Sequence, residues 1–460
     1  MSTPIPSNVV ASPPGRGFWP LILTQLQGAF SDNAYKWLLT FMIMSFSLAQ
    51  ADRDRLVGVA GALFTVPFIL FSMAGGWLAD RFSKRDVAIG TKLLEFGIML
   101  TATIGLLATN LPLLFSCLFL MGTQSALFSA SKYGLLPELL PQKRLSWGNG
   151  VLELTTFVAI IAGTVTGGYL AEWFAGREAW AGGILLLLSA LGFVAAIRIP
   201  PLPAADPARP LRINFLGDLF DQWKLIRSDR VLFLATLGNT YFWFLGALLQ
   251  LGVIFLGTDI LHLSQRETGL LSAAVAIGIG VGSLVAGYVS GNKIELGLIP
   301  LGALGMSVLG LLVARGGAST LATAAQLSLL GFFAGFFIVP VNALLQHRPD
   351  PDKKGGVLGA ANLLSSFGLF AAVGVYYALQ AWLRFNPLEI FLAASVLTIA
   401  ATAYVLWLLP VALVRLVMIF VTHTIYRIRV EGRDNIPERG GALFVSNHLS
   451  FIDALLLAAS

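Results

Sequence analysis

Two ionisable side chains lie in apolar surroundings on either side of one short polar turn. Lys132 falls near the end of the apolar run 111–133, and Glu153 follows soon after the next run begins at 146. Asn149 precedes Glu153 by four residues, so the two share one helix face. A charge at the centre of a membrane-spanning helix costs about 2.5 to 3.5 kcal/mol, and such groups usually face a bundle interior. The pattern predicts a polar pathway between helices. The alternative is structural, with Lys132 reaching the interface and pairing with Glu153.

A second polar group interrupts the first apolar run, in the segment GAFSDNAYKW. Asp32 and Asn33 lie well inside this run, and Lys36 follows Asp32 by four residues. An acid four residues before a base is the favourable order for an ion pair along a helix. Two interpretations stay open. Either the pair neutralises itself, or Asp32 faces a cavity and recognises a cationic or hydrogen-bonding group.

Three further polar residues lie in apolar runs. Gln250 is a candidate contact for a substrate, although a single glutamine often only bonds a neighbouring helix. Lys92 and Glu95, near the entry of the third run, are predicted to form an interfacial pair.

The last part of the chain carries a different chemistry. His448 and Asp453 have the spacing His-x4-Asp, after strand-like RIRVEG and ALFVSN. A histidine base can remove a proton from a hydroxyl, while an aspartate orients and charges its imidazole. Five positions on one continuous helix would turn the two side chains about 140° apart. We therefore expect His448 in a loop and Asp453 in a first helical turn. The simpler alternative is a capping box formed by Ser450 and Asp453.

The composition places these residues in a membrane protein. The chain has 460 residues, of which 56% are hydrophobic and only 12% charged, and its mean hydropathy is +0.79. A soluble globular chain has about 25% charged residues. Cys117 is the only cysteine, so no intramolecular disulfide can form. We expect no cofactor, no metal and no nucleic-acid partner, and we expect a monomer.

Apolar runs long enough to cross about 30 Å of hydrocarbon recur twelve times. We expect them at 18–48, 56–79, 87–108, 111–133, 146–173, 178–198, 231–257, 267–290, 296–314, 319–341, 355–380 and 385–410. This pattern predicts an all-α membrane protein, with an amphipathic helix from Phe215 to Ile226. The expected division is a disordered 1–17, a six-helix bundle 18–198, a linker 199–230, a second six-helix bundle 231–410 and a C-terminal segment 411–460.

Basic residues cluster in alternate loops and so predict the orientation. They are Arg81, Lys84 and Arg85; Lys143 and Arg144; Arg209, Arg212, Lys224, Arg227 and Arg230; and Arg348, Lys353 and Lys354. The opposite loops are shorter and poorer in basic residues. Because cytoplasmic loops carry the excess of lysine and arginine, we expect both termini in the cytoplasm.

The loop after the second run resembles a signature of the major facilitator superfamily. That signature, Gly-x-x-x-Asp-Arg/Lys followed by basic residues, is matched by Gly76, Asp80, Arg81, Lys84 and Arg85. The resemblance implies two pseudo-symmetric six-helix bundles with the substrate path between them. It also implies that these residues gate the cytoplasmic side. After the eighth run, Gly291 occupies the position that corresponds to the aspartate of the signature. We therefore expect weaker gating contacts in the second half of the chain.

Over about residues 18–410, the chain resembles the bacterial lysophospholipid transporter branch of that superfamily. The resemblance rests on the segments FSDNAYK and SASKYGLLPEL and on the pair WGNGVLE–GTVTGGYL. Members of this branch carry lysophospholipid from the outer to the inner leaflet of the cytoplasmic membrane. The resemblance implies that Asp32, Lys132 and Glu153 contact a zwitterionic head group. From their places in apolar runs, we also count Asn33, Asn149 and Gln250 as candidate substrate contacts. Lys132 would attract the phosphate of the head group, and Asp32 or Glu153 would attract its ammonium.

The His448–Asp453 segment resembles the start of the glycerolipid acyltransferases that acylate lysolipids. The resemblance implies an acyl thioester donor, either acyl-CoA or acyl carrier protein. We expect a truncated α/β domain that is poorly ordered after Gly432, so that the 460 residues transport but do not acylate. Two alternatives stay open. One is a proton-coupled drug or metabolite antiporter of the same fold, and the other is a membrane-anchored lysolipid acyltransferase.

Overall fold

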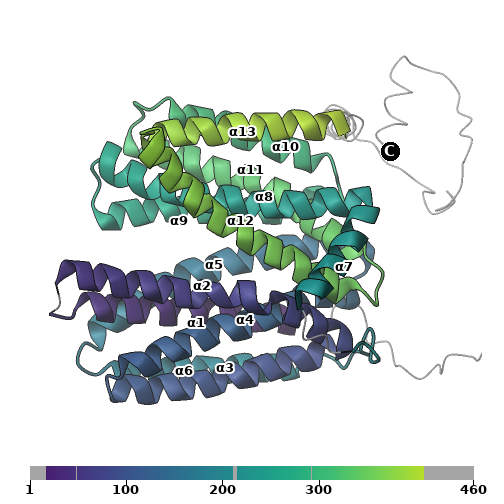
Figure 1. Cartoon of the computed structure of the whole chain (residues 1–460), viewed down its shortest axis with the longest axis horizontal. Coiled ribbons are helices and arrows are strands. Elements are labelled where there is room, and N and C mark those ends of the chain that lie inside the picture. The colour runs from purple at the N-terminus through teal and green to yellow at the C-terminus, as the bar shows by residue number, and fades with distance from the viewer. Residues whose placement is uncertain (1–16, 48, 211–214, 292, 409–460) are drawn as a thin grey trace, which may run out of the picture.

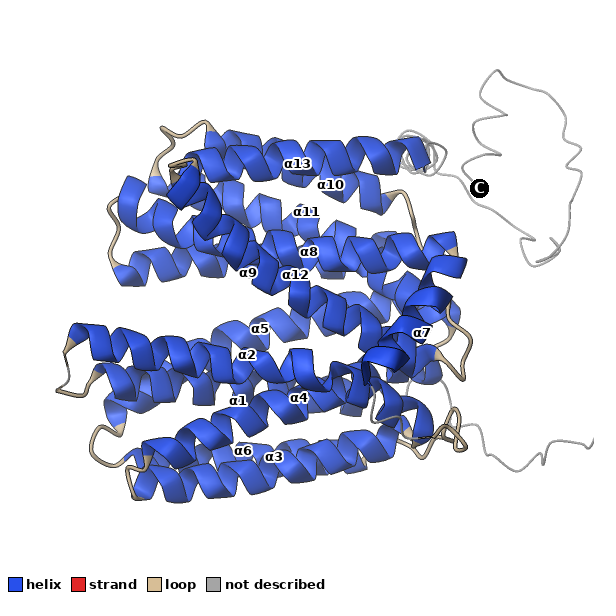
Figure 2. Cartoon of the chain, viewed as in Figure 1, coloured by secondary structure: helices blue, strands red, loops and turns tan. Residues whose placement is uncertain are grey.

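The structure is a computed structural model that describes residues 17–47, 49–210, 215–291 and 293–408. Every regular element in these ranges is a helix (Figure 2). Helices are expected in lipid because each backbone N–H and C=O can then bond within its own segment. The strands predicted near RIRVEG and ALFVSN, the pair His448 and Asp453, and the expectations for residues 1–16 lie outside the described residues.

The helices follow one another along the chain in two groups of six. The first group is α1 (Phe18–Met44), α2 (Gln50–Arg81), α3 (Lys84–Leu107), α4 (Leu111–Leu139), α5 (Leu145–Trp173) and α6 (Glu178–Ile197), with the short helix η1 (Gln142–Arg144) before α5. The amphipathic helix predicted between the groups is α7 (Phe215–Ser228). The second group is α8 (Arg230–Phe255), the π-helical turn η2 (Leu256–Ile260), α9 (Gln265–Val289), α10 (Leu298–Ala314), α11 (Thr320–His347), α12 (Lys354–Trp382) and α13 (Pro387–Leu408).

The two groups lie side by side, with α1–α6 below and α8–α13 above in Figure 1. The helix α7 joins them at one end, which we call the α7 end; the opposite end is the far end. Across the boundary between the groups, α5 packs against α9 and α2 packs against α12. The described residues of the basic loops named above lie at the α7 end, because helices alternate in direction along the chain.

In the described part of the chain, twelve long helices overlap the twelve expected runs, but some are longer: α2 begins at Gln50 rather than at 56, and α11 ends at His347 rather than at 341. Ten of them are long and apolar enough to cross a membrane. The exceptions are α1, whose polar residues lower its mean hydropathy, and α10, which has 17 residues. Large apolar side chains are exposed on the outer faces, and tryptophans mark the helix ends: Trp19 and Trp407 at the α7 end, and Trp173, Trp180 and Trp382 at the far end. This is the arrangement of a protein surrounded by lipid.

The fourth helix is longer than the sequence predicts. The expected span ended at residue 133, whereas α4 continues through Pro137 to Leu139. A proline is tolerated inside a membrane-spanning helix when neighbouring helices rearrange around the freed carbonyl. Lys132 therefore lies two turns inside α4 rather than at its end. The polar turn that follows contains Pro141 and η1.

Candidate functional site

A buried carboxylate lies where the two helix groups meet. Glu153 of α5 is only 2% exposed. Its Oε1 accepts a hydrogen bond from the hydroxyl of Tyr133 on α4 at 3.1 Å. The same oxygen accepts one from Nδ2 of Asn342 on α11 at 3.0 Å. Glu153 is thus held by the first group through α4 and by the second group through α11.

The ammonium of Lys132 contacts an aromatic ring rather than a hydrogen-bonding group. It is 4.5 Å from the ring centroid of Tyr133, a cation–π distance. No hydrogen bond or ion pair to Lys132 occurs within the described ranges. The side chain is half-buried and within electrostatic reach of both Glu153 and Asp32. Three of the predicted residues therefore form one electrostatic group, in which Lys132 interacts with Asp32 and with Glu153.

Asp32 of α1 also faces α4. Its Oδ1 accepts a hydrogen bond from Nε2 of Gln124 at 3.1 Å, and its Oδ2 accepts one from the hydroxyl of Ser125. The expected partner Lys36 forms no ion pair with Asp32 within 4.0 Å in the part of the chain described. The Lys36 ammonium lies instead over Phe64, 5.3 Å from its ring centroid. Asn33 donates to the carbonyl of Ala29 in its own helix at 2.8 Å.

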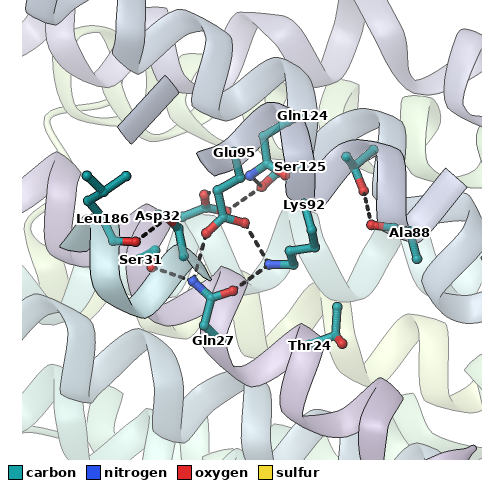
Figure 3. Close-up of polar contacts among 12 residues, drawn as sticks. Thr24, Gln27, Ser31, Asp32, Ala88, Lys92, Glu95, Gln124, Ser125 and Leu186 are labelled. Carbon is teal, nitrogen blue, oxygen red and sulfur yellow. Dashed lines mark hydrogen bonds and ion pairs between the residues drawn. The ribbon is translucent and has the colours of Figure 1, made fainter. Parts of the chain in front are cut away.

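A buried polar network continues from the neighbourhood of Asp32 into the first group (Figure 3). Lys92 and Glu95 are not an interfacial pair, because their side chains are 1% and 0% exposed. Their ion pair is 2.6 Å long. Gln27 of α1 bridges them, accepting from Lys92 and donating to Glu95, both at 2.8 Å. Gln27 also donates to Ser31, the neighbour of Asp32, at 2.8 Å. The i, i+3 spacing of Lys92 and Glu95 inside an apolar run is the sequence signal that could have indicated a buried ion pair.

Asn149 forms a second link between the groups. It exchanges two hydrogen bonds with Gln346 of α11, at 2.9 and 2.7 Å, and both side chains are fully buried. As the spacing predicts, Asn149 and Glu153 share one face of α5. Their partners Gln346 and Asn342 are likewise one turn apart on α11. The α5–α11 boundary is therefore closed by two polar contacts in this state.

Gln250 lies apart from the other candidates. It donates to the hydroxyl of Ser272 at 3.1 Å and lines a cavity of about 240 Å³ in the second group. Apart from Gln250 and Ser272, the lining residues are apolar; they come from α8 to α13, together with Phe157 of α5. Phe157 is one helical turn beyond Glu153. The cavity is therefore an apolar space that begins beside the polar cluster.

A group of polar contacts centred on Asp80, which we call the lock at Asp80, joins the two helix groups at the α7 end. Its carboxylate accepts hydrogen bonds from the backbone N–H groups of Gly355 and Gly356, at 2.6 and 2.8 Å. These N–H groups belong to the first turn of α12, where the helix dipole is positive. Arg209, in the segment before α7, binds the same carboxylate. Arg209 also binds Asp218 of α7 at 2.9 Å. Asp80 thus ties the first group to both α7 and the second group.

The other signature residues have different partners. Arg81 donates to the carbonyl of Arg209 at 2.8 Å, which holds the connecting segment. Lys84 is fully buried and pairs with Glu138 of α4 at 2.5 Å. Arg85 donates to the carbonyl of Ile199 at 2.7 Å. In this state, Lys84 therefore binds within the first group, and Arg85 binds the segment that follows α6. Neither side chain contacts the second group through these bonds.

The replacement Gly76→Val is expected to open the α7 end. A Cβ at Gly76 would lie 2.6 Å from the carbonyl oxygen of Gly355, so any side chain must push α2 and α12 apart. The measurement is labelling of a cysteine placed at Ser129, which is 9% exposed and bonded to Asn362 of α12 at 3.0 Å. With Cys117 replaced by serine, a water-soluble maleimide should react faster in the variant.

The matched control for this prediction is Gly97→Val, because a Cβ at Gly97 would meet nothing within 4 Å. It introduces the same side chain into a helix without a steric conflict. Equal labelling in Gly76→Val and Gly97→Val would mean that the contact at Gly76 does not hold the α7 end closed.

Comparison with known proteins assigns this architecture to a family. Residues 28–373 match the sequence model described as Major Facilitator Superfamily. The chain belongs to the major facilitator superfamily. Residues 427–460, which include His448 and Asp453, match the model described as Acyltransferase.

Curated relatives include lysophospholipid transporters. The protein named lysophospholipid transporter LplT from Salmonella gallinarum is 30% identical over 367 residues, covering 78% of this chain and 87% of that protein. LplT from Cronobacter sakazakii is 30% identical over 369 residues, covering 78% and 88%.

Solved structures share the fold. The human organic anion transporter MFSD10 (TETRAN) aligns with a TM-score of 0.71 at 17% identity, covering 86% of this chain and all of that one. A fucose:proton symporter from E. coli, FucP, aligns with a TM-score of 0.69 at 12% identity, covering 85% and 98%. Identities this low support the major facilitator fold and no particular substrate.

Proposed function

We propose that this protein transports lysophospholipid from the outer to the inner leaflet of a bacterial cytoplasmic membrane. Similarity to the LplT proteins supports the substrate class. The observation that carries the proposal is the ammonium of Lys132, which has no hydrogen-bonded partner among the described residues and lies within electrostatic reach of Asp32 and Glu153. A cation placed between two acids suits a ligand that bears both a negative and a positive charge.

The head group of lysophosphatidylethanolamine matches this arrangement. Its phosphate would bind Lys132 through charge-assisted hydrogen bonds. Its ammonium would bind Glu153 or Asp32. Each carboxylate accepts two hydrogen bonds in the structure, and an ionised carboxylate has about four acceptor positions. Both acids therefore retain capacity for a ligand.

The apolar cavity in the second group suits the acyl chain. It begins at Phe157, one turn from Glu153, so a lipid with its phosphate at Lys132 can direct its chain into this space. Burial of each methylene contributes about 0.8 kcal/mol. The cavity thereby supports an amphipathic substrate over a sugar or another fully polar solute.

Filling this cavity is expected to change the preference for chain length. Gly246 lines it, and a Cβ there would meet nothing within 4 Å, so Gly246→Phe adds a ring without a backbone clash. Translocation of lysolipids with long chains should fall several-fold, while lysolipids with short chains should be moved at nearly the original rate. The measurement is competition between the two substrates in proteoliposomes. An equal loss for both chain lengths would exclude the cavity as the acyl-chain site.

We place the α7 end in the cytoplasm, because the basic loops lie there. The lock at Asp80 and the contacts of Asn149 with Gln346 then close the cytoplasmic side. In this orientation, the structure corresponds to a state that receives substrate from the outer leaflet. Release into the inner leaflet requires that these contacts break.

The C-terminal segment suggests what happens to the delivered lipid. Its match to the Acyltransferase model includes the His-x4-Asp spacing at His448 and Asp453. We propose that His448 acts as the general base on the glycerol hydroxyl and that an acyl thioester is the donor. Lysolipid arriving in the inner leaflet would then be reacylated by the fused enzyme.

An ion-gradient experiment separates this function from its main rival. Leaflet-resolved uptake of labelled lysophosphatidylethanolamine is measured in proteoliposomes with and without a proton gradient. The proposal predicts lysolipid movement in both conditions. No lysolipid movement, together with strict proton dependence for a soluble compound, would favour a proton-coupled antiporter in which Asp32 or Glu153 carries the proton.

A further inference from the structure

A second cavity lies where α5 and α9 meet at the α7 end. Its volume is about 230 Å³, and its lining residues are Arg144, Trp147, Gly287, Tyr288 and Gly291. Arg144 and Trp147 belong to the start of the α5 segment, in the first group. Gly287 and Tyr288 lie in the last turn of α9, and Gly291 is two residues beyond its end, in the second group. The cavity therefore straddles the boundary between the two groups.

This cavity depends on close approach of the two groups. A Cβ at Gly287 would lie 3.0 Å from the carbonyl oxygen of Ser146 and 3.0 Å from the Cα of Trp147. The hydroxyl of Ser146 also donates to the carbonyl of Lys293 at 3.3 Å. Any separation of α5 from α9 at this end would pull the lining residues apart. The cavity in this form belongs to the state in which the α7 end is closed.

The charge of the cavity is positive. Arg144 is exposed, and no hydrogen bond or ion pair engages its guanidinium in the part of the chain that the structure describes. The nearby ammonium of Lys293 is already bound by Glu295 at 2.8 Å. A guanidinium presents paired N–H donors that match two oxygens of a phosphate. Arg144 is thus available for a phosphate-bearing ligand.

The surrounding aromatic residues place the cavity at the membrane surface. The ring of Trp147 lies 4.9 Å from that of Phe18 and 6.3 Å from that of Trp19. Trp19 is 56% exposed and Tyr288 is 66% exposed. Exposed tryptophan and tyrosine side chains at helix ends mark the level of lipid head groups. The cavity therefore opens where a phospholipid head group lies rather than in bulk water.

We propose that this cavity binds the head group of an anionic phospholipid from the leaflet at the α7 end. Basic pockets between membrane-spanning helices on the cytoplasmic side take such head groups. The lipid would bind Arg144 through its phosphate and pack against Trp147 and Tyr288. It is a bound regulator rather than the cargo, which we place at Lys132. The proposal rests on the membrane orientation argued above and is independent of the identity of the cargo.

The expected consequence is stabilisation of one conformational state. A ligand that binds one of two states better shifts the population toward that state. Because the lining residues come from both groups, the lipid would favour the closed α7 end. Anionic lipid should therefore slow labelling of the Ser129→Cys reporter described above.

The test measures thermal unfolding of the purified chain in detergent, with added phosphatidylglycerol or phosphatidylcholine. We expect phosphatidylglycerol to raise the midpoint temperature by several degrees more than phosphatidylcholine. Arg144→Gln should lose at least half of this difference. Lys143→Gln removes one positive charge from the adjacent exposed position, which does not line the cavity, and should retain it.

Each contrary result is informative. An equal loss in Arg144→Gln and Lys143→Gln would mean a general effect of charge, and no preference for phosphatidylglycerol would mean no anionic lipid site. Either would overturn the proposal. Equal stabilisation by inorganic phosphate alone would assign the cavity to a soluble anion and also contradict it. None of these readouts depends on transport, so failure of the lysolipid function leaves them interpretable.

Discussion

Replacing Lys132 with alanine is expected to reduce lysophospholipid translocation by about 10- to 100-fold, which corresponds to the loss of a hydrogen bond to a charged group worth about 1.5 to 3 kcal/mol. Folding should be little affected, because no ion pair or hydrogen bond to Lys132 exists within the described residues. The measurement combines translocation rates in proteoliposomes with thermal stability of the purified variant. Lys132→Arg should keep part of the activity, since a planar guanidinium replaces a point charge imperfectly.

The control for Lys132→Ala is Lys353→Ala. Lys353 is half exposed and pairs with Asp350 at 3.6 Å on the surface. Its replacement removes the same charge without changing Asp32, Lys132 or Glu153, so translocation should stay near the original rate. If Lys132→Ala lost stability in step with activity, Lys132 would have a structural role only.

Breaking the buried pair of Lys92 and Glu95 is expected to have the largest effect on stability. Removing one partner of a buried ion pair costs about 3 to 5 kcal/mol, because the other charge stays buried without compensation. Lys92→Met leaves Glu95 with only the amide of Gln27 as a donor. The measurement is the thermal midpoint in detergent, which should fall sharply. Replacing both residues, as Lys92→Met with Glu95→Leu, should recover much of the loss, since no unpaired charge remains.

The exposed pair of Lys353 and Asp350 provides the comparison. Asp350→Asn should change stability by about 0 to 1 kcal/mol, as surface pairs typically do. If the midpoint of Lys92→Met matched that of Asp350→Asn, the network of Gln27, Lys92 and Glu95 would not be a stabilising element of the first group. A double variant no more stable than Lys92→Met would show that the pair contributes more than charge compensation.

Much of the fold follows from local patterns in the sequence. The twelve long helices and α7 lie where apolar runs and the amphipathic pattern predict them, because hydrocarbon leaves the backbone few alternatives to a helix. The shared face of Asn149 and Glu153 also follows, since it depends only on helical spacing. The end of α4 could not be predicted from the sequence, because Pro137 is tolerated by packing that the local sequence does not show.

The partners of the site residues could not be predicted in the same way. Asn342 and Gln346 are almost 200 positions from Glu153 and Asn149, and their contacts depend on how the two groups meet. The sequence placed Lys92 and Glu95 at an interface because the run begins with charged residues. Their burial depends on Gln27 of another helix, which supplies a donor and an acceptor at once. The apolar cavity is likewise formed by residues from seven helices and has no local sequence signature.

Leaflet-resolved translocation of two lipids that differ only in the head group tests the central claim most directly. Proteoliposomes containing this chain receive labelled lysophosphatidylethanolamine or a monoacylglycerol with the same acyl chain. We predict that this chain moves the first faster than protein-free vesicles do and leaves the rate of the second unchanged, because only the first carries a phosphate for Lys132. We also predict that Lys132→Ala brings the first down towards its rate in protein-free vesicles. Equal acceleration of both lipids by the unaltered protein would contradict recognition of the head group by Asp32, Lys132 and Glu153.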